Sequence, residues 1–299
     1  MNRTRITPPP IVPREKLDFG LDGDIPKYWL DNDPFKTRFF DALSTLFPVG
    51  ERFFITCVRD FKDQITDPKL IQEIKDFTRQ EAQHSLLHTR YNDRLKAQGI
   101  QVDAILEKQE QRLFGMLRGK TSRTFTLGVT AASEHVTAIM ADAFVERPHM
   151  FLGADERIRA LYVWHAMEEM EHKGVAYDVL TKVAHASYFQ RVMAMVVVTI
   201  LFPYHVLRIM RHMLEVDGFK GWARRKIWLK GLWWLYKPGG VYLPMMGKYF
   251  SYLKPGFHPW QEPVVPSYEP WLRLLKETGD PVTAGNRLVA QRAHELAHA

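Results

Sequence analysis

Apolar residues recur along most of this chain at the three-to-four-residue spacing of an α-helix, and few stretches alternate with the period of a β-strand. The pattern therefore predicts a mainly helical protein. A first helix is expected to follow Asp33-Pro34 and to end before Pro48. A longer helix is expected to begin near Glu51 and to end near Ile65.

Turn signals divide the following part of the chain into further helices. Asp67 is suited to an N-cap, and Gly99 is suited to the end of a helix. The predicted helical segments are 68–98, 102–117, 123–145 and 155–186. The segment 102–117 lies in a long crossover, whereas the other connections are short. This connectivity predicts an all-α, ferritin-like four-helix bundle.

Two of the predicted helices, 68–98 and 155–186, carry polar residues in the middle of an otherwise apolar face. A buried carboxylate costs several kcal/mol, of the order of 3–5, unless it is paired or binds a metal. The two polar segments therefore indicate a shared buried site. Their central positions are Glu81, His84 and His88 in the first helix, and His165, Glu169 and His172 in the second.

The other two core helices each supply one glutamate that faces inward. Glu51 shares its face with apolar residues, and Glu134 lies among small residues that let helices approach closely. Two single glutamates with two Glu-x-x-His pairs are the ligand set of the di-iron and di-manganese carboxylate bundles. Hard carboxylates with two imidazoles suit iron, with manganese as the alternative. The predicted ligands are Glu51, Glu81, His84, Glu134, Glu169 and His172.

Further polar residues lie near this set on the helical wheel. We expect His165 to be a seventh ligand, and the alternative is that it only orients a carboxylate. His88 and Glu168 are expected to support the ligands by hydrogen bonds, although Glu168 also competes with Glu169 for the role of ligand. Glu171 points away from the seam and is expected to be a solvated charge.

Three stretches of sequence, 47–54, 80–84 and 164–173, resemble a known family. Through them, residues 20–187 look like the bacterial predicted metal-dependent hydrolases, which are placed among the ferritin-like proteins. The pattern His165-x-x-x-Glu169-x-x-His172 also resembles the last ligand helix of the di-iron arylamine N-oxygenases. In that family the extra histidine supplies a seventh ligand. The second resemblance implies the type of site and not the substrate.

The leading functional hypothesis is a di-iron oxygenase or oxidase that acts on a small or lipid-like organic substrate. A separate reductase would supply the electrons, because the chain has no flavin or iron–sulfur motif and only one cysteine, Cys57. A first alternative is a two-metal hydrolase of an ester or a phosphate. A second alternative is a protein that handles iron without catalysis.

Positive charge is concentrated in the C-terminal third of the chain. The net charge is +7, and residues 186–260 contain eleven lysines and arginines against two acidic residues, together with many aromatic residues. This composition predicts contact with an anionic membrane surface. Segment 192–207 has no formal charge but is shorter than the roughly 20 residues of a span, so a buried or interfacial helix is expected. No nucleic-acid-binding module is recognised, so no such partner is expected.

The expected organisation is a flexible arm at 1–19, a two-metal bundle at 20–187 and an amphipathic helical extension at 188–299. No apolar signal region follows the N-terminus, so we expect a cytoplasmic protein, peripheral on the inner face of the membrane. A homodimer is a further expectation. The sequence ends near the pattern His294-Glu295-Leu296-Ala297-His298, which can bind zinc when a third ligand is present. At a fraying terminus we expect it to bind metal at most loosely.

Overall fold

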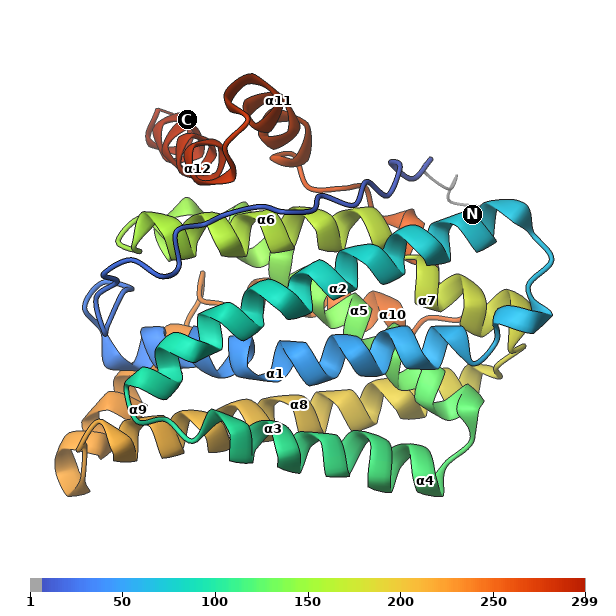
Figure 1. The fold of residues 1–299 in the computed structure, drawn as a ribbon, viewed down its shortest axis with the longest axis horizontal. Helices are drawn as coiled ribbons and strands as arrows, with labels where there is room; N and C mark the ends of the chain where they lie inside the picture. Colours follow the sequence, from blue (N-terminus) through green and yellow to red (C-terminus); the bar gives the residue numbers. More distant parts are fainter. Residues whose placement is uncertain (1–6, 299) are drawn as a thin grey trace.

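The computed structural model describes residues 7–298. Helices dominate this part of the chain, and its only β pairing is an isolated bridge between Leu30 and Ala154. The all-α prediction is therefore confirmed for the described residues. Four long helices carry the predicted ligands, and they are α1 (Pro34–Arg59), α2 (Pro68–Ala97), α5 (Arg123–Val145) and α6 (Glu156–His172). Helix α1 packs against α2 and α5, and α6 packs against α2 and α5 (Figure 1).

Local sequence signals determine where these four helices begin. Each follows a residue whose side chain accepts hydrogen bonds from the free N–H groups of the first turn. Pro34 and Pro68 occupy first helical positions, where the missing N–H costs nothing. The predicted helices 68–98 and 123–145 are confirmed as α2 and α5. The four capping residues are Asp33, Asp67, Ser122 and Asp155.

The predicted break at Pro48 is wrong, because α1 continues through this residue. Proline lacks the N–H that would bond the carbonyl of Ser44 one turn earlier. The side-chain amide of Asn92, on α2, donates to that carbonyl instead, at 3.2 Å. A contact between helices thus replaces the missing hydrogen bond, and Glu51 lies in the interior of one long helix.

The fourth predicted helix, 155–186, is interrupted directly after His172. Helix α7 (Val175–Asp178) and a π-helical turn, η4 (Val179–Val183), complete the segment. At the interruption, the indole of Trp260 occupies the space that a Cβ on Gly174 would need. Glycine is therefore required there, and glycine weakens the interior of a helix.

The remaining helices cover the four central ones on two sides (Figure 1). On one side α8 packs against α1 and α5, while the crossover helix α3 and the π-helical turn η2 lie beside α1. On the other side α12 packs against α6 and α11. The bounds are α3 (Val102–Glu110), η2 (Gln111–Leu117), α4 (Arg118–Lys120), α8 (Tyr188–Val216), α9 (Gly221–Tyr236), α10 (Met246–Tyr252), α11 (Tyr268–Thr278) and α12 (Pro281–Ala297). Short 3₁₀ turns lie at Lys62–Gln64, Pro148–Met150, Leu243–Met245 and Pro259–Gln261.

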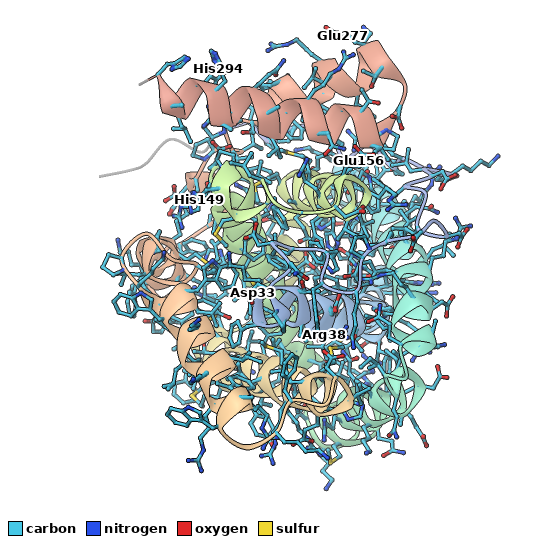
Figure 2. The ribbon with its side chains drawn as sticks, turned by 90° about the vertical axis from the view of Figure 1, so that its left-hand side faces the viewer. Asp33, Arg38, His149, Glu156, Glu277 and His294 are labelled. Atoms are coloured by element: carbon cyan, nitrogen blue, oxygen red, sulfur yellow. The ribbon has the colours of Figure 1, made fainter. Side chains whose placement is uncertain are left out.

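A buried ion cluster joins the end of α8 to the beginning of α1. The guanidinium of Arg38 donates to Asp41 at 2.7 Å and to Asp217 at 2.7 and 2.8 Å. Lys27 adds a contact to Asp217 at 2.6 Å. The side chains of Arg38 and both aspartates are 0% exposed, and Figure 2 shows Arg38 within the body of the molecule. The cluster holds α8 beside α1, where both helices line a cavity described below.

The outer face of α8 is also apolar. This is the one helix of the described residues that is long and apolar enough to cross a membrane, which by itself is weak evidence. The charge-free segment 192–207 lies inside it, and the helix continues through Pro203. One side of α8 packs on the bundle, and the other side exposes Phe189, Met193, Val196, Ile200 and Tyr204.

The N-terminal segment lies along α6 (Figure 1). Phe19 is buried, and Arg14 pairs with two glutamates of α6. These contacts hold part of the predicted flexible arm 1–19 against the bundle. Residues 1–6 of that arm lie outside the described residues.

Candidate metal centre

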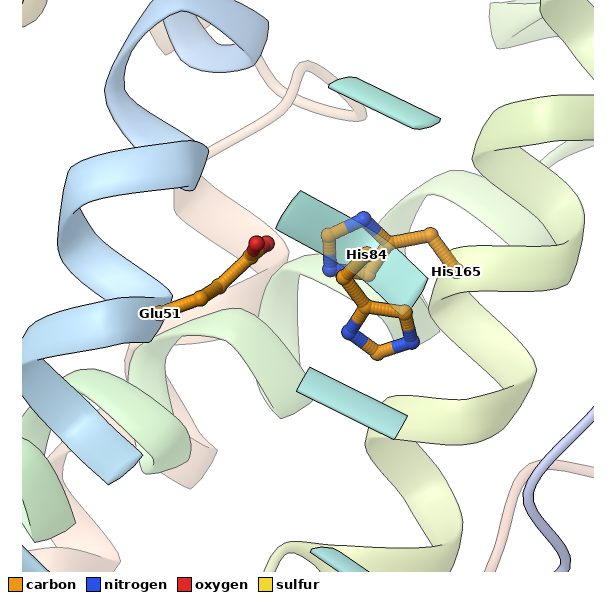
Figure 3. A group of neighbouring side chains, drawn as sticks. All are labelled: Glu51, His84 and His165. Atoms are coloured by element: carbon orange, nitrogen blue, oxygen red, sulfur yellow. The ribbon is translucent and has the colours of Figure 1, made fainter. Parts of the chain in front are cut away.

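Six of the predicted ligands lie in two buried groups where the four central helices meet. Within each group the donor atoms lie within 4.8 Å of one another. The groups are Glu51, His84 and His165, and Glu81, Glu169 and His172. Figure 3 shows Glu51 of α1 pointing towards the rings of His84 and His165. Glu134 joins the second group, because its Oε2 is 3.3 Å from Nε2 of His172.

Glu169 connects the two groups. Its Oε1 is 3.0 Å from Nε2 of His165 and 3.8 Å from Nδ1 of His84. Its Oε2 is 3.5 Å from Nε2 of His172 and accepts a hydrogen bond from the hydroxyl of Thr137 at 2.6 Å. One carboxylate therefore reaches both groups, which is the position that a shared ligand of two metal ions would occupy.

Several donor atoms of the centre are buried without a hydrogen-bond partner. A buried polar atom without a partner costs about 1–3 kcal/mol, and a charged one costs more. A bound cation would remove this cost, so the donor set fits two metal ions. Carboxylate and imidazole donors suit iron, manganese or zinc. The unpartnered atoms are Oε1 of Glu51, both carboxylate oxygens of Glu81 and Glu134, Nδ1 of His84 and Nε2 of His172.

The crowding of carboxylates changes the acid–base properties of the centre. Burial, followed by the charge of Glu81, raises the pKa of Glu51 and of Glu134 well above the ordinary value. Burial lowers the pKa of His84 well below its ordinary value. A neutral imidazole is the form that binds a metal. The carboxylates thus repel one another, and a cation between them would favour their charged forms.

A carboxylate outside the two groups holds the ring of His84. Oε2 of Glu168 is 3.1 Å from Nε2 of His84, while its Oε1 accepts hydrogen bonds from Trp164 at 2.9 Å and Arg14 at 3.0 Å. This contact leaves Nδ1 of His84 facing the centre, as in carboxylate–histidine–metal arrangements. Glu168 therefore lies behind His84, whereas Glu169 lies inside the centre.

A second network holds the ring of His172. Nδ1 of His172 lies 2.9 Å from Oε1 of Gln80, and the amide of Gln80 donates to Glu171 at 2.7 Å. Glu171 also accepts hydrogen bonds from Arg14 at 2.7 Å and from the hydroxyl of Tyr268 at 2.8 Å. Nε2 of His172 is thereby turned towards the carboxylates.

The prediction that Glu171 is a solvated charge is wrong, because this residue is 1% exposed. The helical wheel describes only α6 itself. It does not show that the N-terminal segment and α11 cover that side of the helix.

His88 lies at the other end of the centre, beside His165. Its Nε2 is 2.7 Å from Nδ1 of His165, and its Nδ1 is 2.9 Å from the hydroxyl of Ser44. Both ring nitrogens of His165 are thus within hydrogen-bond distance of a neighbour. His165 would have to exchange its contact with Glu169 for a metal in order to act as the seventh ligand through Nε2.

Sequence reasoning missed several residues that support the ligands. Gln80 lies four residues before His84, and Thr137 lies three residues after Glu134, so both share a helix with a ligand. A polar residue three or four positions from a candidate ligand lies beside it on the helix, and this spacing could have predicted both supporting residues. Arg14 and Tyr268 are distant in sequence, and no local pattern points to them.

The C-terminal histidine motif lies away from the centre. His294 and His298 are exposed at the end of α12, with ring centroids 4.3 Å apart, and Figure 2 shows His294 at the periphery. Neither belongs to a group of three or more metal-ligating side chains in residues 7–298.

The sequence was compared with models of known protein families, and one model matches most of the chain. A family model described as "Predicted metal-dependent hydrolase" matches residues 13–263. The chain belongs to this family. The region shared with the predicted metal-dependent hydrolases contains all the ligands proposed above and also Arg14, but it ends before Tyr268. No curated protein and no solved structure matches the chain.

Proposed function

We propose that this protein is an enzyme that depends on two metal ions, and that α1, α2, α5 and α6 hold them as a ferritin-like bundle. The observation that carries the proposal is the set of buried, unpartnered donor atoms that converge from these four helices. Two short links and one long crossover connect the helices, which supports the ferritin-like arrangement. The ligands would be the seven residues named above, from Glu51 to His172.

For the reaction, we propose hydrolysis, which the family description supports, and an ester or a phosphate as the bond that is cleaved. Two bound metal ions would polarise the bond to be cleaved and supply an activated water at neutral pH. Glu51 and Thr137 line a cavity beside the centre. A substrate in this cavity would therefore meet the centre at Glu51, and Thr137 would hold Glu169 in position by its hydrogen bond.

The second candidate is an oxygenase or oxidase reaction with O₂ and an external electron donor, with iron as the metal. Two specific observations favour it. Four carboxylates contribute to the centre, and such an anionic set favours the higher oxidation state of iron. The ligands are at most 5% exposed and the adjacent cavity is largely apolar, so a reactive oxidant would be shielded from water.

Loading the protein with different metals should separate the two reactions. If hydrolysis is the function, the zinc-loaded protein should cleave nitrophenyl esters or phosphates without O₂ or reductant, because zinc serves as a Lewis acid. The ferrous protein should then consume no O₂ beyond the rate of free iron. The opposite pattern, O₂ consumption by the ferrous protein and an inert zinc form, would replace hydrolysis by the oxygenase reaction.

We also propose that α8 and α9 form a face that contacts an anionic membrane. In α9, Trp228 and Trp234 pack inward against Phe35 and Phe39 of α1. Trp222 and Trp233 are 62% and 66% exposed on the same helix. Interfacial tryptophans combined with basic residues are typical of helices that lie on an anionic membrane, and the outer side of α8 is apolar as well.

The double variant Trp222→Ser/Trp233→Ser should bind vesicles of mixed neutral and anionic lipid at least tenfold more weakly than the wild type. Each exposed indole would otherwise bury apolar surface, at about 25 cal/mol per Å². Co-sedimentation at low salt measures the effect. Leu86→Ser is the matched control, because Leu86 is exposed on α2. Equal binding by the double variant and this control would remove the membrane proposal.

A further inference from the structure

The cavity beside the centre has a volume of about 700 Å³, within the range of roughly 300–1,000 Å³ that is usual for small-molecule sites. Helices α1, α3, α5 and α8 and the turn η2 contribute its walls. Most of the lining is apolar, and Glu51 of the centre forms part of it. The apolar lining includes Phe47, Phe53, Phe54, Val129, Val198 and Phe202.

Basic side chains line the part of the cavity between η2 and α8. Nη1 of Arg112 is 3.3 Å from Nδ1 of His205, and Arg208 follows one turn later on α8. Lys108 belongs to the same lining and, like Arg208, is exposed to solvent. In residues 7–298, neither arginine nor Lys108 forms an ion pair with a carboxylate. These cations are therefore available to a ligand that enters from solvent.

The electrostatics around His205 show the same excess of positive charge. Burial, followed by the charges of Arg112 and Arg208, lowers the pKa of His205 to about 4. A neutral His205 can accept the hydrogen bond from Arg112, which fixes the guanidinium at the edge of the cavity. The part of the cavity that α1 and α5 line, where Glu51 lies, has no arginine or lysine in its lining that could pair with an anion.

We propose that this cavity binds an amphiphile with one apolar chain and one anionic head group. The head group lies against Arg112 and Arg208, and the chain extends along the apolar lining towards Glu51. A carboxylate and a phosphate share the chemistry that the arginines recognise. This assignment does not need the proposed hydrolysis, because it places the apolar chain next to the centre, where the chain offers no ester or phosphate bond. Bound in this way, the amphiphile would be a substrate only of the oxygenase candidate and a ligand otherwise.

Displacement of a fluorescent fatty acid from the full-length protein, as purified and with its metal content measured, tests the proposal. In a series of straight-chain carboxylates with 8, 10 and 12 carbons, affinity should rise about fourfold per added methylene, as expected for burial of the chain. Alkyl phosphates of the same lengths distinguish the two head groups. Tighter binding of either series supports the proposal and identifies the preferred head group.

Variants separate the two parts of the cavity. Arg112→Met should weaken binding of the 12-carbon carboxylate at least tenfold and leave binding of the 12-carbon alcohol nearly unchanged. Val197→Trp, which fills part of the cavity, should weaken both. Arg211→Met is the matched control, because Arg211 lies on α8 outside the lining and pairs with Glu215. Unchanged melting temperature and metal content show that each variant is folded.

Two results would overturn the proposal. One is equal affinity of the Arg112→Met and Arg211→Met proteins for the carboxylate, and the other is an affinity that does not depend on chain length. Binding does not require turnover in this experiment. A protein that binds the amphiphile as described, but converts no ester, phosphate or O₂ with any metal, would contradict the proposed enzymatic function and leave the ligand assignment standing.

Discussion

Replacing Glu81 and Glu169 together by glutamine should abolish the binding of metal ions. The two residues are the central carboxylates of the Glu-x-x-His helices, and Glu169 reaches both donor groups. A metal at 100 times its dissociation constant stabilises the folded protein by about 2.7 kcal/mol. The wild type should therefore melt at a higher temperature with metal than with chelator, whereas the double variant should melt at one temperature in both.

The same variant gives a smaller expected loss when a chelator is present. Without metal, the charge of Glu81 raises the pKa of Glu51 and of Glu134, so a neutral amide at position 81 relieves repulsion. The two changes also weaken contacts with histidines, since Oε1 of Glu81 is 3.1 Å from Nε2 of His172 and Oε1 of Glu169 is 3.0 Å from Nε2 of His165. In chelator the double variant should therefore differ less from the wild type in stability than it does with metal. Elemental analysis with calorimetry measures both effects. A double variant that retained as much metal as the wild type would show that the ligands are elsewhere.

Arg38→Met should lower the free energy of unfolding by about 3 kcal/mol, because it removes the buried guanidinium that bonds two aspartates at once. The side chains of Asp41 and Asp217 are 0% exposed, and the longer contact of Arg94 with Asp41 and the partly exposed Lys27 at Asp217 would remain. Urea denaturation measures the loss. Lys36→Met is the matched control on the same helix, since its pair with Asp31 is partly exposed and should contribute about 1 kcal/mol or less.

A double variant tests whether the loss arises from the unpaired charges. Arg38→Met with Asp217→Asn should recover part of the stability, because a neutral amide at 217 removes one of the two charges, whereas Asp41 keeps its hydrogen bonds from Trp29 and Tyr91. A single variant that was no less stable than Lys36→Met would contradict the structural role of the cluster.

The order and length of the helices could be predicted where capping residues and periodicity agreed. Segments 68–98 and 123–145 both begin after a capping side chain and correspond to α2 and α5. The predicted helix boundaries were wrong where a contact with a distant residue outweighed the local sequence signal. Asn92 supplies the hydrogen bond that Pro48 cannot make, and Trp260 packs on Gly174. Neither contact can be read from the sequence next to the proline or the glycine.

The burial of the polar cluster was predictable for a different reason. A carboxylate in an apolar seam is costly enough to require an explanation wherever the helix packs, so Glu81 and Glu169 could be selected as candidate ligands one helix at a time. Residues that only hold the candidate ligands in place by hydrogen bonds cannot be recognised in this way. Glu171 looks solvated on α6 alone, but Arg14 and Tyr268 cover it. The cavity depends on how α3 and α8 meet α1, and no single segment contains that information.

The candidate ligands lie between residues 51 and 172, and α2 and α6 alone supply Glu81, Glu169 and His172, which form one complete donor group. The other group also needs Glu51 of α1. If each group binds one metal ion as proposed, the first ion would report the docking of α2 on α6, and the second would report the addition of α1. A metal-to-protein ratio measured after purification or limited proteolysis would then distinguish a partly assembled bundle from a complete one.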